Sequence, residues 1–421
     1  MRLLNTTSFK FEWMVRETCE YAILSHRWIE EEVGDEITFA TLEHAKTNGP
    51  TSRQAASWSK MEKACEQARN DRLKYIWIDT ICIDKNDIQE LGRSLNSMFD
   101  WYARAKICYV YLQDAKRTIQ RAGTNYYSEW FERGWTLQEL LAPSEMVFYD
   151  MDWCRLGTRT ELAPHLSNAS KIDVDYLKRP GSFREASVAT KMSWMAGRST
   201  KYVEDITFSM LGILNVKLPY IPAEGAQAFF RLQSELLKSE AFDESLFAWS
   251  VPADKHLRCY EVYKNRQLQQ EWLWSPPDNR WGLLAPSPDC FVSRWRIDVD
   301  QDAVVPRIRG GFQEKSLGVT VEVPLKFVMS RLTGMTKSKV IFPLNCWRWN
   351  EQLKKRTNIV LRLERTRNAT AWTREECDTL GPLAKGWGSA KDWNVKDNCV
   401  MGIDQQLAGS ITVRQPMFKH A

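Results

Sequence analysis

Three short groups of residues in the first third of the chain could together break a glycosidic bond. They are Ser25-His26-Arg27-Trp28, Asp79 with Cys82, and Trp135 with Glu139. Because Trp135 and Glu139 are four residues apart, a helix would place them on the same face. A carboxylate beside an aromatic ring can accept hydrogen bonds from a ribose, and it can stabilise the positive charge that develops at the anomeric carbon as the bond breaks.

Glu139 and His26 each have a structural interpretation as well. Glu139 could be a carboxylate on a helix surface that pairs with Arg133 or Arg27. His26 could act as a base, but a single histidine near a strand end is more often a structural hydrogen-bonding group. The residues alone leave both pairs of alternatives open.

The same choice applies to the arginine and the tryptophans of these groups. Arg27 could hold a phosphate of a dinucleotide through its planar guanidinium, or it could form a buried ion pair with Asp79 or Glu139. Trp28 and Trp135 could stack on a base or a nicotinamide ring. In a chain with 19 tryptophans, however, core packing is the more common role.

The second group could also suggest metal or thiol chemistry. Asp79 and Asp84 could be magnesium ligands, but the chain lacks the GxxxxGK[ST] sequence that would bring phosphates to the metal, so a loop-capping role is favoured. Cys82 has no matching second cysteine and is typical of a small buried apolar residue. A nucleophilic pair of Cys82 with His26 remains open, because the sequence does not show whether the two side chains meet.

The elements that must position these groups alternate between strands and helices. Short apolar runs predict strands at residues 21–25, 75–79, 107–112 and 146–149, and apolar residues at helical spacing predict helices at 58–68, 88–102 and 128–141. This alternation is typical of an α/β domain with a mainly parallel sheet. Ligands of such sheets bind beyond the carboxyl ends of the strands, which is where the three groups are expected to lie.

The rest of the chain is expected to be helical and then rich in β-structure. Helices are predicted at residues 187–197, 203–214 and 225–238, and short alternating runs such as 319–323 and 358–363 predict strands after residue 249. We therefore expect an α/β core over residues 1–160, a helical extension over 161–248 and a β-rich domain over 249–421.

Composition excludes several classes of protein. The formal charge is +5, without a basic block, so no nucleic-acid partner is expected. The ten cysteines include no CxxC pair and no zinc spacing, which favours reduced thiols, no metal and a cytoplasmic location. No run of about 18 apolar residues indicates a membrane span or secretory signal.

Four ordered blocks of this sequence resemble the signature blocks of the fungal heterokaryon incompatibility (HET) domain family. They are YAILSHRW at 21–28, YIWIDTICID at 75–84, SMFDWY at 97–102 and RGWTLQELLAP at 133–143. Looser matches extend the similarity to about Trp249, among them Glu204-Asp205, where the family usually has Arg-Glu-Glu-Asp. The resemblance implies a cell-death effector in fungal non-self recognition.

HET domains are distantly similar to TIR domains, which implies a TIR/flavodoxin-like parallel sheet with flanking helices. Some TIR domains cleave NAD with a glutamate on the helix after the third strand, and Glu139 falls on that position. Because the nicotinamide ring of NAD is already cationic, it can leave without a strong general acid. The resemblance thus implies an NAD glycohydrolase for which NAD is the substrate and no cofactor is required. The residues expected to shape its pocket are Ser25, His26, Arg27, Trp28, Asp79, Cys82 and Trp135.

The same resemblance also implies an alternative without catalysis. TIR-like domains act as signalling adaptors that self-associate or dock to a partner, and the polar strand ends would then be structural. Self-association through this domain and an incompatibility partner protein are therefore expected partners. An adaptor should still kill cells when Glu139 is replaced by glutamine, whereas an enzyme should not.

Overall fold

A computed structural model describes most of the first 250 residues and separate segments of the remainder. The described residues are 1–14, 19–116, 128–238, 243–250, 284–291, 297–299, 309–311, 318–323, 339–350, 355–365, 372–375 and 409–414. The chain divides into two compact units, one of residues 1–185 with 198–223 and one of residues 186–197 with 224–421. The division into three domains at residues 160 and 248 stays a prediction.

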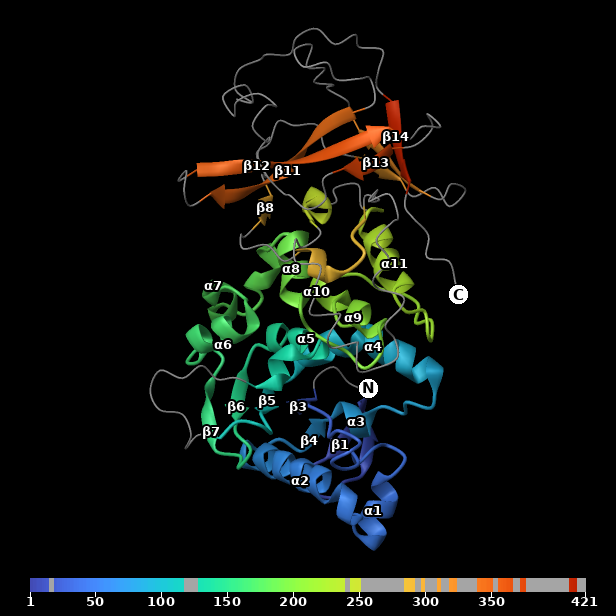
Figure 1. The fold of residues 1–421 in the computed structure, drawn as a ribbon. Helices are drawn as coiled ribbons and strands as arrows, with labels where there is room; N and C mark the ends of the chain where they lie inside the picture. Colours follow the sequence, from blue (N-terminus) through green and yellow to red (C-terminus); the bar gives the residue numbers. More distant parts are fainter. Residues whose placement is uncertain are drawn as a thin grey trace. The chain divides into compact units, whose positions relative to one another are not determined.

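The first unit is built on a seven-stranded sheet with the order β2-β1-β4-β3-β5-β6-β7 (Figure 1). The four middle strands β4, β3, β5 and β6 are mutually parallel, whereas β1, β2 and β7 add to the edges in antiparallel fashion. The strands are β1 (Arg2–Asn5), β2 (Phe11–Trp13), β3 (Ala22–His26), β4 (Tyr75–Trp77), β5 (Ile107–Tyr111), β6 (Met146–Tyr149) and β7 (Arg155–Thr158).

The parallel strands follow the order second, first, third, fourth, which is that of flavodoxin-like sheets. Right-handed crossovers then require the first helix to cover one face and the next two to cover the other. Figure 1 shows this arrangement, with α2 (Ala55–Asn70) on one face and α4 (Ile88–Arg104) and α5 (Trp135–Leu141) on the opposite one. The predicted α/β fold with a mainly parallel sheet is confirmed.

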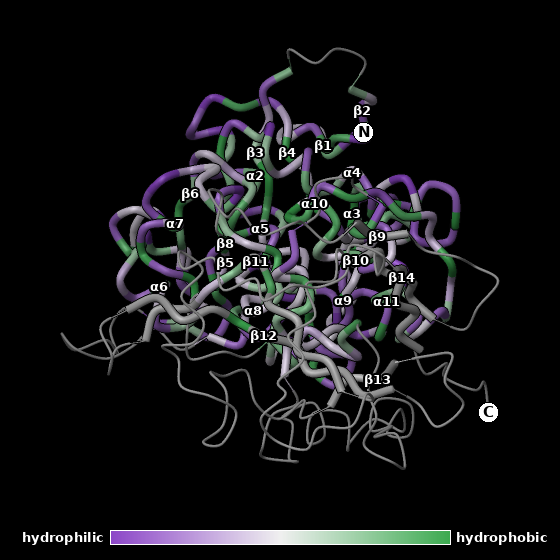
Figure 2. Tube along the Cα trace, turned by 90° about the horizontal axis from the view of Figure 1, so that it is seen from above, coloured by the Kyte–Doolittle hydropathy of each residue, from purple (hydrophilic) through white to green (hydrophobic). Residues whose placement is uncertain are grey.

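Apolar sequence explains why these elements form. Every residue of β3 is buried, as expected for a central parallel strand that is covered on both faces. In α4 the buried residues Leu95, Met98, Phe99 and Tyr102 recur at helical spacing, and the Asp87 carboxylate caps the helix by accepting two backbone N–H groups. Figure 2 shows hydrophobic stretches at β3 and α10 (Leu211–Leu214) and hydrophilic stretches in the outer loops.

Two predicted helices are each divided into two. The predicted helix 128–141 consists of η3 (Glu129–Glu132) and α5, and the predicted helix 203–214 consists of α9 (Asp205–Phe208) and α10. The first break lies at Gly134, where an added Cβ would be 2.6 Å from Cγ2 of Thr200. The Gly134 N–H donates to the Ser199 carbonyl, and the Ser199 N–H donates to the Glu132 carbonyl. A segment distant in the sequence thus fixes the backbone between η3 and α5.

Several shorter helices complete the units. Within the described residues, those of the first unit are α1 (Leu42–Asn48), η1 (Ser52–Gln54), α3 (Asp79–Cys82), α6 (Ala163–Ser170), α7 (Val174–Lys178) and η4 (Ser182–Glu185). Those of the second unit are α8 (Val188–Met195), α11 (Gln227–Leu236), η5 (Glu244–Phe247) and η6 (Pro288–Phe291). In the part of the chain that the structure describes, every helix is too short or too polar to cross a membrane.

The second unit contains a second seven-stranded sheet, with the order β8-β11-β12-β13-β14-β10-β9. Its neighbouring strands are antiparallel except for β13 and β14. The strands are β8 (Ile297–Val299), β9 (Arg309–Gly311), β10 (Gly318–Val323), β11 (Lys339–Asn350), β12 (Lys355–Arg365), β13 (Trp372–Glu375) and β14 (Gly409–Arg414). The prediction of β-strands after residue 249 is confirmed for the described segments.

Candidate functional site

The candidate site lies at the carboxyl end of β3, the central strand of the first sheet. The connections from β3 to β4 and from β4 to β5 pass over opposite faces, so the strand order reverses between β3 and β5. Ser25 and His26 are the last two residues of β3 and lie at this reversal, opposite Val110 and Tyr111 of β5. Helix α5 brings Glu139 to the same place.

Glu139 is buried against the end of β3, with 7% of its surface exposed. The Ser25 hydroxyl donates a hydrogen bond of 2.5 Å to Oε2 of Glu139, and the Tyr102 hydroxyl also bonds to this carboxyl group. Burial raises the pKa of Glu139 to about 8, even though these hydrogen bonds favour the charged form. The interpretation of Glu139 as a carboxylate on the helix surface is therefore wrong.

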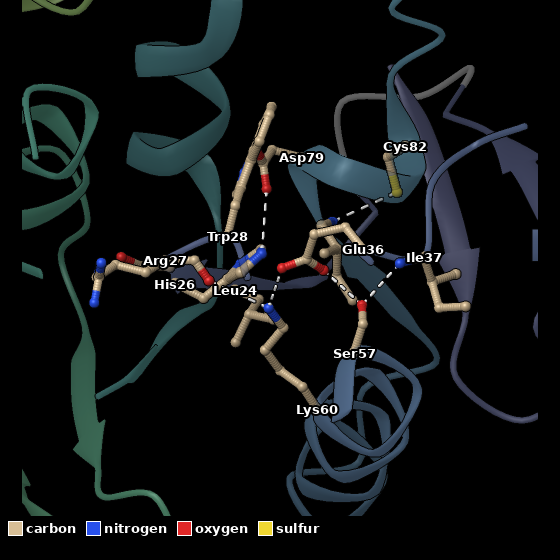
Figure 3. A network of polar contacts seen from close by, with 12 residues as sticks. Leu24, His26, Arg27, Trp28, Glu36, Ile37, Ser57, Lys60, Asp79 and Cys82 are labelled. Atoms are coloured by element: carbon tan, nitrogen blue, oxygen red, sulfur yellow. Dashed lines mark hydrogen bonds and ion pairs between the residues drawn. The ribbon is translucent and has the colours of Figure 1, made fainter. Parts of the chain in front are cut away.

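Trp28 and Asp79 form a second, more open part of the site. The Trp28 indole Nε1–H donates to Oδ2 of Asp79 at 2.8 Å. The Lys85 ammonium lies 3.4 Å from the centre of the Trp28 ring and 3.9 Å from the same Asp79 oxygen. Both side chains of the hydrogen bond are partly exposed, and Figure 3 shows the indole pointing toward Asp79. Asp79 is the first residue of α3, one position after its N-cap residue Ile78.

Arg27 is surrounded by carboxylates that the sequence did not indicate. Its guanidinium pairs with Glu30 at 2.9 Å and with Glu129, and it lies 4.0 Å from Asp114. The predicted alternative of a pair with Asp79 or Glu139 is therefore wrong. A phosphate at Arg27 would have to compete with three carboxylates.

His26 is buried at the end of β3. Among the described residues, neither of its ring nitrogens has a hydrogen-bond partner, and Nε2 lies 3.7 Å from Oδ1 of Asp79. Burial lowers the pKa of His26 well below its usual value, and the neighbouring charges of Lys60, Lys85 and Arg133 lower it further. The imidazole is therefore neutral. The prediction that His26 is a structural residue with its hydrogen bonds satisfied is wrong.

A buried ion pair fixes the loop that follows β3. Lys60 of α2 donates to Glu36 at 2.6 Å and to the Arg27 carbonyl at 3.2 Å. Glu36 also accepts hydrogen bonds from Ser57 Oγ and from the Ile29 N–H. Figure 3 shows these side chains directed toward one another beside the end of β3. The network holds both ends of the segment that carries Arg27 and Trp28.

Trp135 is half-buried, and its Nε1–H donates to Oδ2 of Asp205 at 3.2 Å. Burial raises the pKa of Asp205 to about 7, while the charges of Arg133 and Lys85 oppose this shift. Asp205 and Lys85 thus lie near the predicted groups, although neither was chosen from the sequence. Asp205 could have been found from the Glu204-Asp205 pair, which loosely matches a signature block of the family. Lys85 directly follows the second signature block.

Cys82 does not form a nucleophilic pair with His26. Its thiol is buried in α3 and accepts a weak hydrogen bond from the Ile78 N–H, and burial raises its pKa to about 12. This environment is typical of an unreactive thiol. In the part of the chain that the structure describes, no group of three or more His, Cys, Asp or Glu side chains could hold a metal ion.

Comparison with known proteins agrees with three of the four sequence blocks, those at residues 21–28, 75–84 and 97–102. A family model described as "Heterokaryon incompatibility protein (HET)" matches residues 21–127. The vegetative incompatibility protein HET-E-1 of Podospora anserina is 33% identical over 262 residues, which are 60% of this chain and 19% of that relative. This chain thus spans about a fifth of the length of that relative. No solved structure matches the chain. Residues 21–127 of this chain are therefore similar to the heterokaryon incompatibility (HET) family.

Proposed function

We propose that this chain acts in heterokaryon incompatibility as an effector of cell death, and that its α/β unit cleaves NAD with Glu139 as the catalytic carboxylate. The name of the Podospora relative, a vegetative incompatibility protein, supports the first part. The observation that carries the second part is the position of Glu139 at the reversal of strand order, hydrogen-bonded to Ser25. Ligands of flavodoxin-like sheets bind at this reversal.

The proposed reaction is the hydrolysis of the bond between ribose C1′ and the nicotinamide nitrogen. The electron pair of that bond leaves with nicotinamide, which thereby becomes neutral, and a positive charge remains on the ribose. A water oxygen then bonds to C1′, and the proton released from that water passes to the Glu139 carboxylate and on to solvent. The products are ADP-ribose, nicotinamide and one proton.

The surroundings of Glu139 support this role. Because burial raises its pKa to about 8, the free protein near neutral pH holds Glu139 mainly in the protonated form. A cationic nicotinamide ring beside it would lower this pKa and favour the carboxylate, so that the charge appears when the substrate is bound. The partly exposed rings of Trp28 and Trp135 and the Lys85 ammonium supply stacking and anion-binding groups nearby.

A nicotinamide-release assay on the full-length protein tests the proposal. Concentrated wild-type protein should release nicotinamide from NAD, and Glu139→Gln should reduce kcat at least about 100-fold, because glutamine cannot supply the negative charge. Glu145→Gln, which changes an exposed carboxylate of the same unit, should leave the rate unchanged. Absence of nicotinamide release by the wild type under conditions that promote self-association would refute NAD cleavage.

The burial of Glu139 favours a second candidate function, a signalling adaptor without catalysis. With 7% of its surface exposed, the side chain reaches a ligand only if neighbouring groups move. In an adaptor, Glu139 would be a protonated core residue, and the α/β unit would act by self-association or by docking to an incompatibility partner. Expression of the Glu139→Gln variant in a fungal host separates the two candidates. An adaptor carrying this substitution should still kill cells, whereas an enzyme should not.

A further inference from the structure

Two buried side chains behind Glu139 form a hydrogen-bonded series with it. The Trp130 indole Nε1–H donates to the Ser25 hydroxyl oxygen at 2.9 Å, and the Ser25 hydroxyl donates to Oε2 of Glu139 at 2.5 Å. An indole nitrogen can only donate a hydrogen bond, and a serine hydroxyl carries a single proton. Because Trp130 occupies an acceptor site of Ser25, the serine proton is directed toward the carboxyl group.

Neither Trp130 nor Ser25 can reach a ligand in this structure, since both are fully buried. Trp130 is held in place by its packing, with its ring 5.0 Å from that of Phe131 and 6.0 Å from that of Phe148, in edge-on arrangements. Its backbone belongs to η3, whose first turn is capped by the Ser128 hydroxyl. A rigid donor is thus aimed at Ser25 from the element just before α5.

We propose that Trp130 and Ser25 are positioning residues that hold Oε2 of Glu139 as a hydrogen-bond acceptor and so fix the orientation of its carboxyl group. The kinetic part of this proposal rests on the proposed NAD cleavage. Its structural part does not, because it concerns only how the carboxyl group is oriented and which of its forms is favoured.

The Tyr102 hydroxyl cannot replace this series. It lies within hydrogen-bonding distance of the Leu24 carbonyl, at 3.2 Å, as well as bonding to Glu139. A phenol has one proton and here has two acceptors within reach, so its donation is shared between them. Ser25 has no such competing acceptor among its described contacts, which are those to Trp130 and Glu139.

The test is a titration of the Glu139 carboxyl group in the full chain, observed by ¹³C NMR with labelled glutamate and assigned with Glu139→Gln. Ser25→Ala and Trp130→Phe should each move the midpoint to higher pH, because both weaken hydrogen bonding to the charged form. The expected shift is about one pH unit for Ser25→Ala, a tenfold change in the ionisation constant, and less for Trp130→Phe.

Trp77→Phe is the matched control for the loss of a buried indole. Trp77 is also fully buried in this sheet and packs against Tyr102, but among the described residues its Nε1–H has no hydrogen-bond partner. It should therefore show the effect of a smaller ring near Glu139 without the loss of a hydrogen bond. The midpoint should remain at the wild-type value.

Kinetic measurement of the same variants separates this proposal from NAD cleavage itself. Ser25→Ala and Trp130→Phe should lower kcat more than they raise KM and should shift the acid limb of the pH profile to higher pH. Shifted midpoints in a protein that releases no nicotinamide would uphold the positioning role and reject the proposed function. Midpoints that stay at the wild-type value in both variants, or move equally in Trp77→Phe, would overturn the inference.

Discussion

Two clusters of buried polar groups flank the end of β3, and they differ in how completely they are satisfied. Around Glu36, the carboxylate accepts hydrogen bonds from Lys60, Ser57 and Ile29, and Lys60 also reaches a backbone carbonyl. Around Glu139, the buried carboxyl group is bonded by the Ser25 and Tyr102 hydroxyls, and the ring nitrogens of His26, next to Ser25, have no hydrogen-bond partner among the described residues.

The difference separates a structural cluster from a functional candidate. Buried polar groups in folded proteins are usually hydrogen-bonded, and an exception calls for a physical explanation. The saturated Glu36 cluster holds a loop in one conformation and leaves nothing for a ligand to bind. The incompletely bonded cluster has a raised carboxyl pKa and an imidazole with two unused nitrogens, which are groups that a bound substrate could satisfy.

The largest effect on stability is expected from breaking the saturated cluster. Lys60→Met removes the cation and leaves Glu36 as a buried, unpaired carboxylate, which should lower the free energy of unfolding by about 3–5 kcal/mol. Urea denaturation of the full chain measures this. Lys106→Met removes an exposed partner of Glu20 and should change the free energy of unfolding little, because solvent screens that pair. Similar losses in the two variants would contradict the comparison.

An intermediate effect is expected in the pH dependence of stability. Because burial raises the pKa of Glu139 from 4.5 to about 8, the folded state binds a proton that the unfolded state releases between these values. The free energy of unfolding should therefore fall as pH rises through this window, by at most about 1.4 kcal/mol per pH unit from this group. Denaturation between pH 7 and 8 should show a smaller slope for Glu139→Gln than for the wild type.

That pH range is chosen because Asp205 and His26 contribute mainly below it. Asp205, whose pKa is raised to about 7, adds a slope of the same sign at lower pH. His26, whose pKa is lowered, contributes the opposite sign below about pH 6.5. An unchanged slope in Glu139→Gln between pH 7 and 8 would mean that Glu139 is ionised in the folded protein.

The smallest effect on stability is expected at His26. The ring nitrogens of His26 make no hydrogen bonds among the described residues, so His26→Leu breaks no such bond. The substitution should change the free energy of unfolding by less than about 1 kcal/mol. If the imidazole serves a ligand, NAD cleavage should nevertheless fall in this variant. A loss of several kcal/mol would show that His26 is a structural residue, as Lys60 is.

The fold was predictable because its signals are local. The runs that became β3, β4, β5 and β6 are short, apolar and separated by helical periodicity, and parallel pairing follows from that alternation. The break at Gly134 was not predictable, since the Ser199 carbonyl that bonds to its N–H lies more than 60 residues away in the sequence. Local patterns do not report such long-range contacts.

The site was predictable only in part, for the same reason. The meeting of the Ser25 group with Glu139 follows from sheet topology, because both lie at the carboxyl edge. The partners of Arg27 do not follow, because Asp114 comes just after β5 and Glu129 begins η3, and their approach to Arg27 depends on tertiary packing. Nor does sequence spacing report burial, which distinguishes the Glu139 found here from a carboxylate on a helix surface.

The attachment of residues 198–200 to the start of α5 has a consequence for any fragment of this protein. Arg198 donates to the Arg133 carbonyl, and Ser199 bonds with Glu132 and Gly134. The stretch matched by the family model ends at residue 127, before α5 and before this attachment. A fragment cut at that boundary would lack Glu139 altogether, and one cut at residue 185 would keep Glu139 on a helix whose first turn had lost its anchor. The portion of the chain needed to hold this carboxyl group in place is thus larger than the portion by which the family is recognised.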